Sequence, residues 1–412
     1  IYLEPNATFS DGTRVTVQDV VASYEQARQN VYYKGRFTHI ARVELSSDGG
    51  VDFFLDTPYQ NLALLLDIPI VKASEVTVDN PLGTGPYSLE DGIGGKHLQR
   101  VVGWWCSSDD LVAKDSSIAL VEAESPSQIR DEFEFSGLSV VCTNPQTDSY
   151  ADYRCDFELW EVDSGFMMYI GCNVTYSDYF DDGTLRTFLT YGIVRQSLVD
   201  NNYGGLALPT TLPISPMSPY YSKSLATNYD YDEMRFIDAA SKFRVPTNDK
   251  GVPRTLQLLV NSDDSARLRC ARNIAATLTE LGLACETVES PTSVYEARLQ
   301  AANYDIYLGI TKLPTTADLS EFYRPWGEMS WGGLANETIY NMVNQSLADR
   351  GNYYNLHKLV ADDGRIIPVM AGYYAIYAKR GVLSDLNPAR DNVFYYTLGK
   401  TMESSKVATQ FS

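Results

Sequence analysis

The chain has 412 residues, of which 44% are hydrophobic and 21% charged, a composition typical of a folded globular protein rather than a disordered one. Its formal net charge of −20 argues against nucleic-acid binding, because phosphate contacts need clusters of Lys and Arg. No apolar run reaches the roughly 18 residues that span a bilayer, and the chain is longer than one core normally serves, so two or more lobes are expected.

The first 80 residues predict a small α+β unit. Thr16 is a good N-cap for a helix, and Asp19 three residues later completes a pattern like a capping box. Apolar residues at 17, 20, 21 and 24 give this helix one buried face. The segment RVELSSDGGVDFFLD at 42–56 predicts a hairpin that turns at residues 48–50.

A glycine-rich stretch, GTGPY at 83–87, separates this unit from the next. It lacks the lysine and the following helix that a phosphate loop needs, which leaves a plain turn or a junction between parts of the chain. The region that follows predicts an α/β lobe, with strands at 97–105, 118–124, 138–143 and 165–174 and a short helix at 125–137.

A further unit is expected from about residue 180. It begins with a helix over 181–205 that is ended by glycines, and a proline-rich connector follows. Next comes a β–α–β pattern, with strands at 255–261 and 284–290 around a helix at 265–282. The remaining elements are a strand at 304–310, helices within 336–363 and a pair of strands within 366–382.

No catalytic signature is present in the sequence. G-x-S-x-G, H-E-x-x-H, C-x-x-C and the phosphate-loop pattern are all absent, and the three histidines are scattered at His39, His97 and His357. Acidic pairs such as Asp181–Asp182 fit a solvated surface better than the carboxylates of a glycosidase. Two lobes without catalytic chemistry are typical of a binding protein, so we expect no enzyme, no metal and no cofactor.

Four motifs, in this order, resemble the extracellular solute-binding proteins of family 5, the oligopeptide-, dipeptide- and nickel-binding components of ABC importers. They are FSDGTRVTVQDVVASYEQAR at 9–28, GTGPY at 83–87, LRTFLTYGIVRQSLVDNNYGG at 185–205 and NYDIYLGITKLPTTADLSEF at 303–322. The last motif is most similar to a Gram-positive branch. The third departs from the family pattern at Thr187, Gly192 and Val194. In relatives the GTGPY turn returns the chain to the first lobe, so the resemblance favours a junction.

The resemblance implies a two-lobed α/β fold of the periplasmic-binding-protein kind, class II type, with an extra small subdomain and mixed sheets flanked by helices. Residues 1–82 would be the small α+β subdomain of lobe one, truncated at its N-terminus. Residues 83–173 and 374–412 would complete lobe one, and residues 174–373 would form lobe two. Relatives carry a lipoprotein signal before the first motif, so we expect an extracellular, cell-surface lipoprotein whose signal and anchor lie outside this chain.

The implied function is to capture a peptide or similar small solute between the lobes and to deliver it to the permease of an ABC importer. Peptide-binding relatives hold the amino end of the ligand with an aspartate shortly after the fourth motif's strand. Here Lys312 and Leu313 stand in that place, which leaves a longer peptide or another solute open. The alternatives are a ligand-free scaffold or sensor with the same fold and a secreted glycosidase that uses carboxylates.

We expect eight residues to contact the solute. Aromatic residues would stack on it, Lys312 would pair with an anionic end, and polar residues would stand at strand ends. For Asp318 the competing interpretation is a cap of the helix that starts at LSEF, and for the others it is ordinary packing. The eight are Asn261, Thr311, Lys312, Trp326, Trp331, Tyr87, Tyr373 and Asp318.

Overall fold

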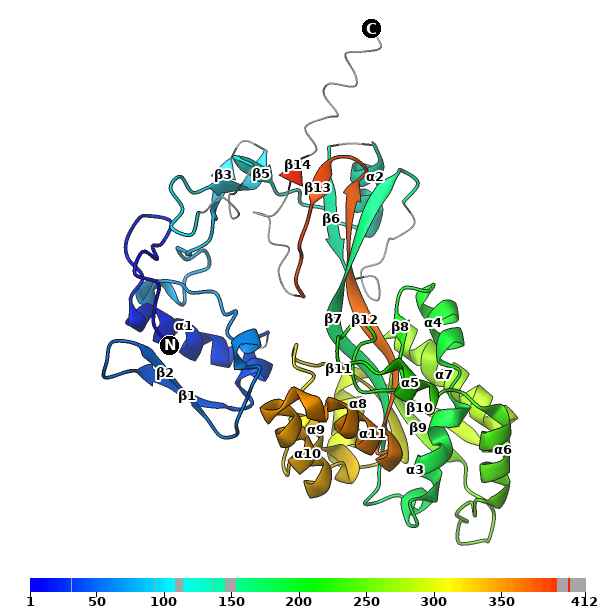
Figure 1. The fold of residues 1–412 in the computed structure, drawn as a ribbon. Coiled ribbons are helices and arrows are strands. Elements are labelled where there is room, and N and C mark those ends of the chain that lie inside the picture. Colours follow the sequence, from blue (N-terminus) through cyan, green and yellow to red (C-terminus); the bar gives the residue numbers. More distant parts are fainter. Residues whose placement is uncertain are drawn as a thin grey trace. The chain divides into compact units, whose positions relative to one another are not determined.

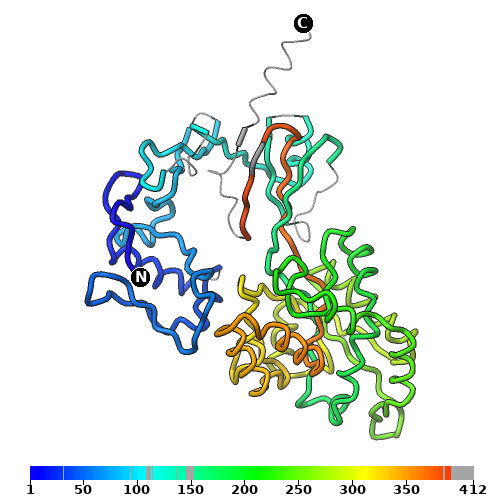
Figure 2. The backbone as a smooth tube through the Cα atoms, viewed as in Figure 1, coloured from blue at the N-terminus to red at the C-terminus, as the bar shows by residue number. Residues whose placement is uncertain are grey.

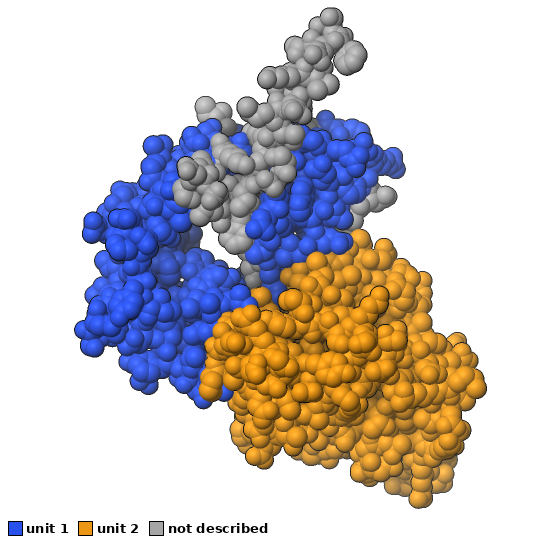
Figure 3. All heavy atoms as spheres, in the orientation of Figure 1, with its two compact units in different colours: residues 1–57, 62–162, 374–412 blue, residues 58–61, 163–373 orange. Residues whose placement is uncertain are grey.

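The computed structural model divides the chain into two compact units (Figure 3). Unit 1 contains Ile1–Thr57, Leu62–Val162 and Tyr374–Ser412, and unit 2 contains Pro58–Asn61 and Asp163–Tyr373. The structure describes residues 1–30, 32–92, 94–107, 113, 115–135, 137–144, 153–390 and 399–400. The predicted lobe boundaries at 82, 173 and 373 stay a prediction, whereas the units themselves divide at 57, 61, 162 and 373.

The first part of unit 1 is a helix packed on a hairpin (Figure 1). Helix α1 (Val17–Gln29) begins after Thr16, whose hydroxyl accepts a hydrogen bond from the Asp19 N–H at 3.3 Å. The Asp19 carboxylate accepts from the Thr16 N–H at 2.8 Å, so the predicted capping box is confirmed. Strands β1 (Ile40–Leu45) and β2 (Val51–Leu55) pair antiparallel, as the hairpin prediction required.

The rest of unit 1 carries short elements, which the smooth trace of Figure 2 follows in chain order. The predicted strand at 97–105 is shorter in the structure and ends at Arg100. The elements are η1 (Lys34–Phe37), η2 (Leu62–Leu65), η3 (Ala73–Glu75), β3 (Tyr87–Gly92), β4 (Gly95–Arg100), β5 (Ser117–Ala119), α2 (Pro126–Phe135), β6 (Val140–Thr143), β13 (Leu383–Asp385) and β14 (Gly399–Lys400).

Unit 2 is built on a mixed sheet, in the order β10-β9-β11-β7-β12 with β8 beside β12, and β6 of unit 1 pairs with the part of β12 that lies in unit 1. Strands β9 (Leu256–Asn261), β10 (Cys285–Ser290) and β11 (Ile306–Lys312) are parallel, and β7 (Phe157–Cys172) runs antiparallel to β11. The predicted pair of strands at 366–382 is instead one continuous strand, β12 (Ile366–Lys379), which pairs with β8 (Leu208–Pro209) and β6. The unit boundaries fall inside β7 and β12.

Helices cover the sheet of unit 2, and the predicted β–α–β pattern is confirmed as β9, α7 and β10. None of the described helices is both long and apolar enough to cross a membrane. The helical elements are η4 (Asp178–Phe180), α3 (Thr184–Phe188), η5 (Leu189–Gly192), α4 (Arg195–Tyr203), α5 (Lys223–Thr227), α6 (Glu233–Lys242), α7 (Ser265–Glu280), α8 (Thr292–Gln300), α9 (Ser320–Tyr323), η6 (Trp331–Gly333), α10 (Glu337–Ala348), η7 (Arg350–Asn352) and α11 (Tyr353–Asp363).

The single helix expected over 181–205 is wrong, because the chain breaks between η5 and α4. Ile193 has φ −103° and ψ 107°, which is extended backbone. Gly192 packs so closely that a Cβ placed on it would lie 2.7 Å from the Phe236 ring and 2.8 Å from Leu278. Packing against two distant segments therefore overrides the local helical pattern.

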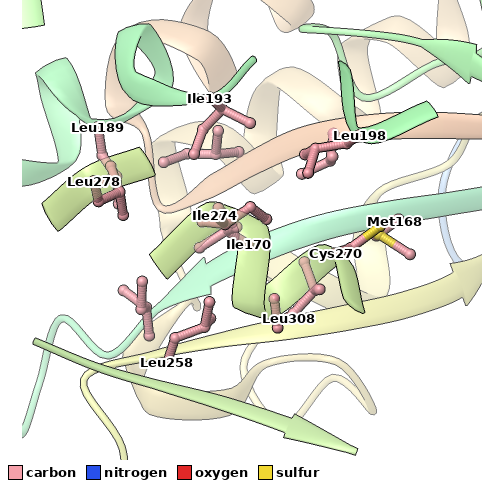
Figure 4. Close-up of a cluster of buried hydrophobic side chains, with 14 of the residues drawn as sticks. Met168, Ile170, Leu189, Ile193, Leu198, Leu258, Cys270, Ile274, Leu278 and Leu308 are labelled. Carbon is pink, nitrogen blue, oxygen red and sulfur yellow. The ribbon is translucent and has the colours of Figure 1, made fainter. Parts of the chain in front are cut away.

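The core of unit 2 lies between the sheet and the helices α4 and α7 (Figure 4). Met168 and Ile170 of β7, Leu258 of β9 and Leu308 of β11 meet Ile274 and other side chains of α7. Strand β9 is buried at five of its six positions, as expected of a central parallel strand that is covered on both faces. Each fully buried Leu or Ile contributes roughly 1.5–3 kcal/mol relative to exposure.

Candidate functional site

The three parallel strands of unit 2 end along one edge of the sheet. Asn261 at the end of β9 is the register partner of Ser290 at the end of β10, and β11 ends at Lys312. Lys312 pairs with Phe166 of β7, three residues from the point where β7 passes into unit 1. Ligands of open α/β sheets bind beyond the carboxyl ends of the strands. We call residues 261–264, 290–292 and 311–318 the carboxyl edge.

A polar network joins two loops of the carboxyl edge. The Asn261 side chain donates to the Thr292 hydroxyl at 3.0 Å and accepts from the Asp263 N–H at 2.9 Å. The Asp263 carboxylate accepts from the backbone N–H of Thr292 at 2.8 Å and from its hydroxyl at 2.7 Å. These hydrogen bonds from Thr292 lower the pKa of Asp263. Asn261 is buried, and its hydrogen bonds fix the conformation of the two loops, whereas Asp263 is exposed.

The loop after β11 forms the third part of the carboxyl edge. Thr311 is half-buried opposite Met167, and the Lys312 side chain is exposed. The Leu313 N–H donates to the Gly165 carbonyl at 2.8 Å, which continues the strand pairing by one residue. The buried Asp318 carboxylate accepts from the Ser320 N–H at 2.8 Å, two residues on. The N-cap of α9 is Leu319, whose side chain makes no capping hydrogen bond, so Asp318 is not the N-cap itself.

The two predicted tryptophans lie elsewhere in unit 2. Trp326 is 98% exposed with φ 62°, on a loop that Glu321 holds through an ion pair with Arg324 at 2.7 Å. Trp331 begins η6, and the Gly332 carbonyl accepts from the Thr175 N–H at 3.3 Å. Thr175 follows the end of β7, whose last residue pairs with the first residue of β11. Trp331 therefore stands near the amino end of β11. The strand itself is roughly 20 Å long, and Lys312 lies at its other end.

The two predicted tyrosines belong to different units. Tyr373 is buried in β12 and is the last residue of unit 2. Tyr87 opens β3 in unit 1, where its hydroxyl donates to the Asp115 carbonyl at 3.1 Å and burial raises its pKa. The structure thus places Asn261 at the carboxyl end of β9 and Thr311 and Lys312 at the carboxyl end of β11, whereas Trp331 stands near the amino end of β11.

Sequence reasoning missed Asp263 and Thr292, which complete the network with Asn261. A signal for them exists, because polar residues directly after parallel strands collect at one edge of a sheet. The sequences NSDD, which starts with the last residue of β9, and SPT, which starts with the last residue of β10, carry that signal.

A cavity of about 230 Å³ lies away from this edge, between η5, α4 and the second half of α7. Its volume is below the roughly 300 Å³ at which ligand pockets usually begin. In the described ranges, no cluster of three or more His, Cys, Asp or Glu side chains could hold a metal ion. The lining residues of the cavity include Ile193, Leu198, Asn201, Asn273 and Thr277.

The sequence matches the family model described as bacterial extracellular solute-binding proteins, family 5 Middle, over residues 1–333. Among curated proteins, the glutathione-binding protein GsiB of Salmonella typhi is 23% identical in an alignment of length 252, which covers 56% of this chain and 47% of that protein. The same protein of Escherichia coli O6:K15:H31 matches with the same identity and coverage. The chain thus spans about half the length of the curated relatives it matches.

Solved structures of similar fold cover 97% of this chain. A putative peptide binding protein AppA from Clostridium difficile has a TM-score of 0.77 at 15% identity, with 88% of that chain covered. NikA from Brucella suis, in complex with Fe(III)-EDTA, has a TM-score of 0.74 at 16% identity with 87% covered. The oligopeptide-binding protein AppA from Bacillus subtilis, in complex with a nonapeptide, has 0.66 at 16% with 86% covered. These likenesses confirm the predicted two-lobed α/β fold.

Proposed function

The chain belongs to the bacterial extracellular solute-binding proteins of family 5, and from that premise we propose that it captures a peptide or similar small solute for an ABC importer. The family match over residues 1–333 is the observation that carries this proposal. Family members are extracellular or periplasmic binding proteins, so the proposal includes no catalytic step. The finer expectation of a cell-surface lipoprotein stays a prediction.

The carboxyl edge of unit 2 is the proposed solute site. It collects side chains and backbone groups from three strand ends, and Lys312 supplies a positive charge there. A lysine ammonium suits the carboxylate of a peptide, and the exposed Asp263 suits an amino group. Because Leu313 replaces the expected aspartate, recognition through backbone hydrogen bonds of a longer peptide fits this edge better than a dipeptide clamp.

Closure around the solute would bend β7 and β12, the two long strands that both units share. Hinges of binding proteins absorb the motion in a few residues where the chain passes between lobes. Here those places are residues 162–163 and 373–374. Tyr373, one of the predicted contacts, is next to the second of them.

Native mass spectrometry of gently purified protein tests the proposal. The native mass is compared with the denatured mass, and the protein is then incubated with a mixture of synthetic peptides from dipeptides to nonapeptides, and separately with glutathione. A non-covalent adduct that Lys312→Met weakens supports solute capture at the carboxyl edge. Lys242→Met, which removes an exposed lysine of α6 paired with Asp238, is the matched control.

A protein that carries no adduct and retains none of these probes would contradict peptide capture and favour the ligand-free scaffold or sensor. Turnover of model glycosides would instead favour the carboxylate-dependent hydrolase. An adduct that survives Lys312→Met unchanged keeps solute capture and overturns the proposed place of binding.

A further inference from the structure

Four residues of the chain belong to unit 2 although both neighbouring segments belong to unit 1. Strand β2 ends at Leu55, the chain joins unit 2 over Pro58–Asn61, and it rejoins unit 1 at Leu62. Leu62 and Leu66 then pack against the core around α1 and the β1–β2 hairpin. We call Pro58–Asn61 the strap.

The strap caps a helix of unit 2. The Gln60 N–H donates to the Leu347 carbonyl at 2.8 Å, and the Gln60 side-chain oxygen accepts from the Arg350 N–H at 3.1 Å. Leu347 lies in the last turn of α10, where the carbonyl groups have no partner within the helix. Gln60 therefore satisfies one carbonyl and one N–H that the helix end itself leaves open.

The strap also holds the loop after β11. The Tyr59 hydroxyl is 2.5 Å from the Thr316 hydroxyl, and Tyr59 is buried. Tyr353 of α11 donates to the carbonyl of the same Thr316 at 2.6 Å, so this threonine is held by its side chain and its backbone together. Burial, and then the nearby Asp318, raises the pKa of Tyr59, which keeps its hydroxyl protonated. Thr316 belongs to the carboxyl edge.

The strap differs from the other two passages of the chain between the units. Those run through β7 and β12, long strands with neighbours along the sheet, whereas the four strap residues have no strand pairing. A few hydrogen bonds, each worth about 1 kcal/mol net in proteins, and the burial of Tyr59 and Asn61 hold it, so we expect it to open at a lower free energy than the whole unit.

We propose that the strap is a releasable latch that decides whether the loop after β11 is held or free. The closed latch keeps Thr316, and with it the third part of the carboxyl edge, in the observed conformation. Its release frees that loop. The effect on the solute rests on the proposed function, but the latch itself does not.

Hydrogen exchange of the full chain without solute tests the latch. We expect the amides of Gln60, Arg350 and Leu313 to be protected from exchange. They should nevertheless begin to exchange at a lower denaturant concentration than the amides of β9, because a local opening exposes them. Tyr59→Phe and Thr316→Val each remove one side of the hydroxyl contact with little change of volume. Both should speed exchange at Gln60 by about fivefold, the factor for one lost hydrogen bond.

Tyr354→Phe is the matched control, because Tyr354 lies on α11 beside Tyr353 and is 49% exposed. Exchange of Gln60 only together with β9, or at the rate of an unstructured amide, overturns the proposal. So does an unchanged rate in both hydroxyl variants. In a separate arm, a peptide from the synthetic mixture should dissociate faster from Tyr59→Phe. If the wild type retains no peptide, the proposed function is contradicted. The hydrogen-exchange experiment contains no solute, so its result still shows whether the strap opens as proposed.

Discussion

Gly309 of β11 lies directly opposite Tyr169 of β7, and the tyrosine ring fills the space that a side chain on Gly309 would take. A Cβ on Gly309 would be 2.7 Å from Tyr169 Cζ. Two residues along each strand the arrangement repeats in reverse, because Tyr307 faces Gly171, where a Cβ would be 2.2 Å from the Tyr307 ring. The two hydroxyls meet at 3.2 Å. Two glycines thus make room for two buried tyrosines.

Gly309→Ala should destabilise unit 2 by about 1–3 kcal/mol, because the added methyl group overpacks a buried site. Thermal or urea unfolding of the variant against the wild type measures this. The double variant Gly309→Ala with Tyr169→Leu gives the control, since the smaller side chain removes the contact with the Tyr169 ring and leaves only that with Tyr307 Cε2 at 2.9 Å. Equal costs of Gly309→Ala in both backgrounds would show that the ring is not the cause.

Arg195 of α4 binds three other segments of unit 2 through two backbone carbonyls and a hydroxyl. Its buried guanidinium donates to the Thr210 carbonyl at 3.0 Å, the Pro368 carbonyl at 2.9 Å and the Thr190 hydroxyl at 2.8 Å. Burial lowers the pKa of Arg195 to about 10, so the group stays charged at neutral pH. The broken helix around Gly192 is what lets η5 and α4 wrap this side chain.

Arg195→Met should therefore cost about 3 kcal/mol or more, since it leaves several buried carbonyls without donors. The measurement is the urea midpoint of unit 2. Arg272→Met, which removes an exposed ion pair with Glu289 at 2.7 Å, should cost less than about 1 kcal/mol. Similar losses in the two variants would contradict the assigned role of Arg195.

His357 of α11 predicts a loss of stability in acid. The ring is fully buried, and burial lowers its pKa from 6.5 to about 4. Above pH 6.5 the imidazole is neutral in both the folded and the unfolded chain. As the pH falls from 6.5 to 4, only the unfolded chain takes up the proton, so folding weakens, by up to about 3 kcal/mol.

His357→Leu should lose less stability than the wild type between pH 7 and pH 4, whatever its stability at neutral pH. Unfolding midpoints across that range make the comparison. His97→Gln in unit 1 is the control and should follow the wild type. If the unfolding midpoints of His357→Leu and the wild type fall in parallel as the pH is lowered, another group dominates the loss of stability in acid.

The proposed site predicts that Lys312 and Trp331, which the sequence analysis both named as solute contacts, contribute differently to affinity. Lys312→Met should weaken binding of an anionic solute by roughly tenfold, the value of one charge-assisted contact of about 1.4 kcal/mol. Trp331→Phe should leave affinity within about twofold, because Trp331 stands near the other end of β11. Isothermal titration with the peptide found by mass spectrometry measures both. A larger effect at Trp331 would move the site to the amino end of the strand.

The elements that the sequence predicts correctly rest on neighbours in the chain. The capping box of α1 needs only Thr16 and Asp19, and β9–α7–β10 follows from hydrophobic periodicity over one segment. The resemblance to the family was also visible, because its motifs are short local patterns in a fixed order. The positions of Asn261 and Lys312 at strand ends were predictable, because polar residues there follow apolar runs, whereas their role in binding stays a prediction.

What the tertiary structure decided depends on residues far apart in the sequence. The break at Gly192 comes from Phe236 and Leu278, and the glycine at 309 is explained by Tyr169. The separation of Trp331 from Lys312 follows from the register of β11 on β7. The strap needs hydrogen bonds between residues some 260 to 290 positions apart. No local pattern encodes such contacts, because their free energy exists only once the chain has folded and brought both partners together.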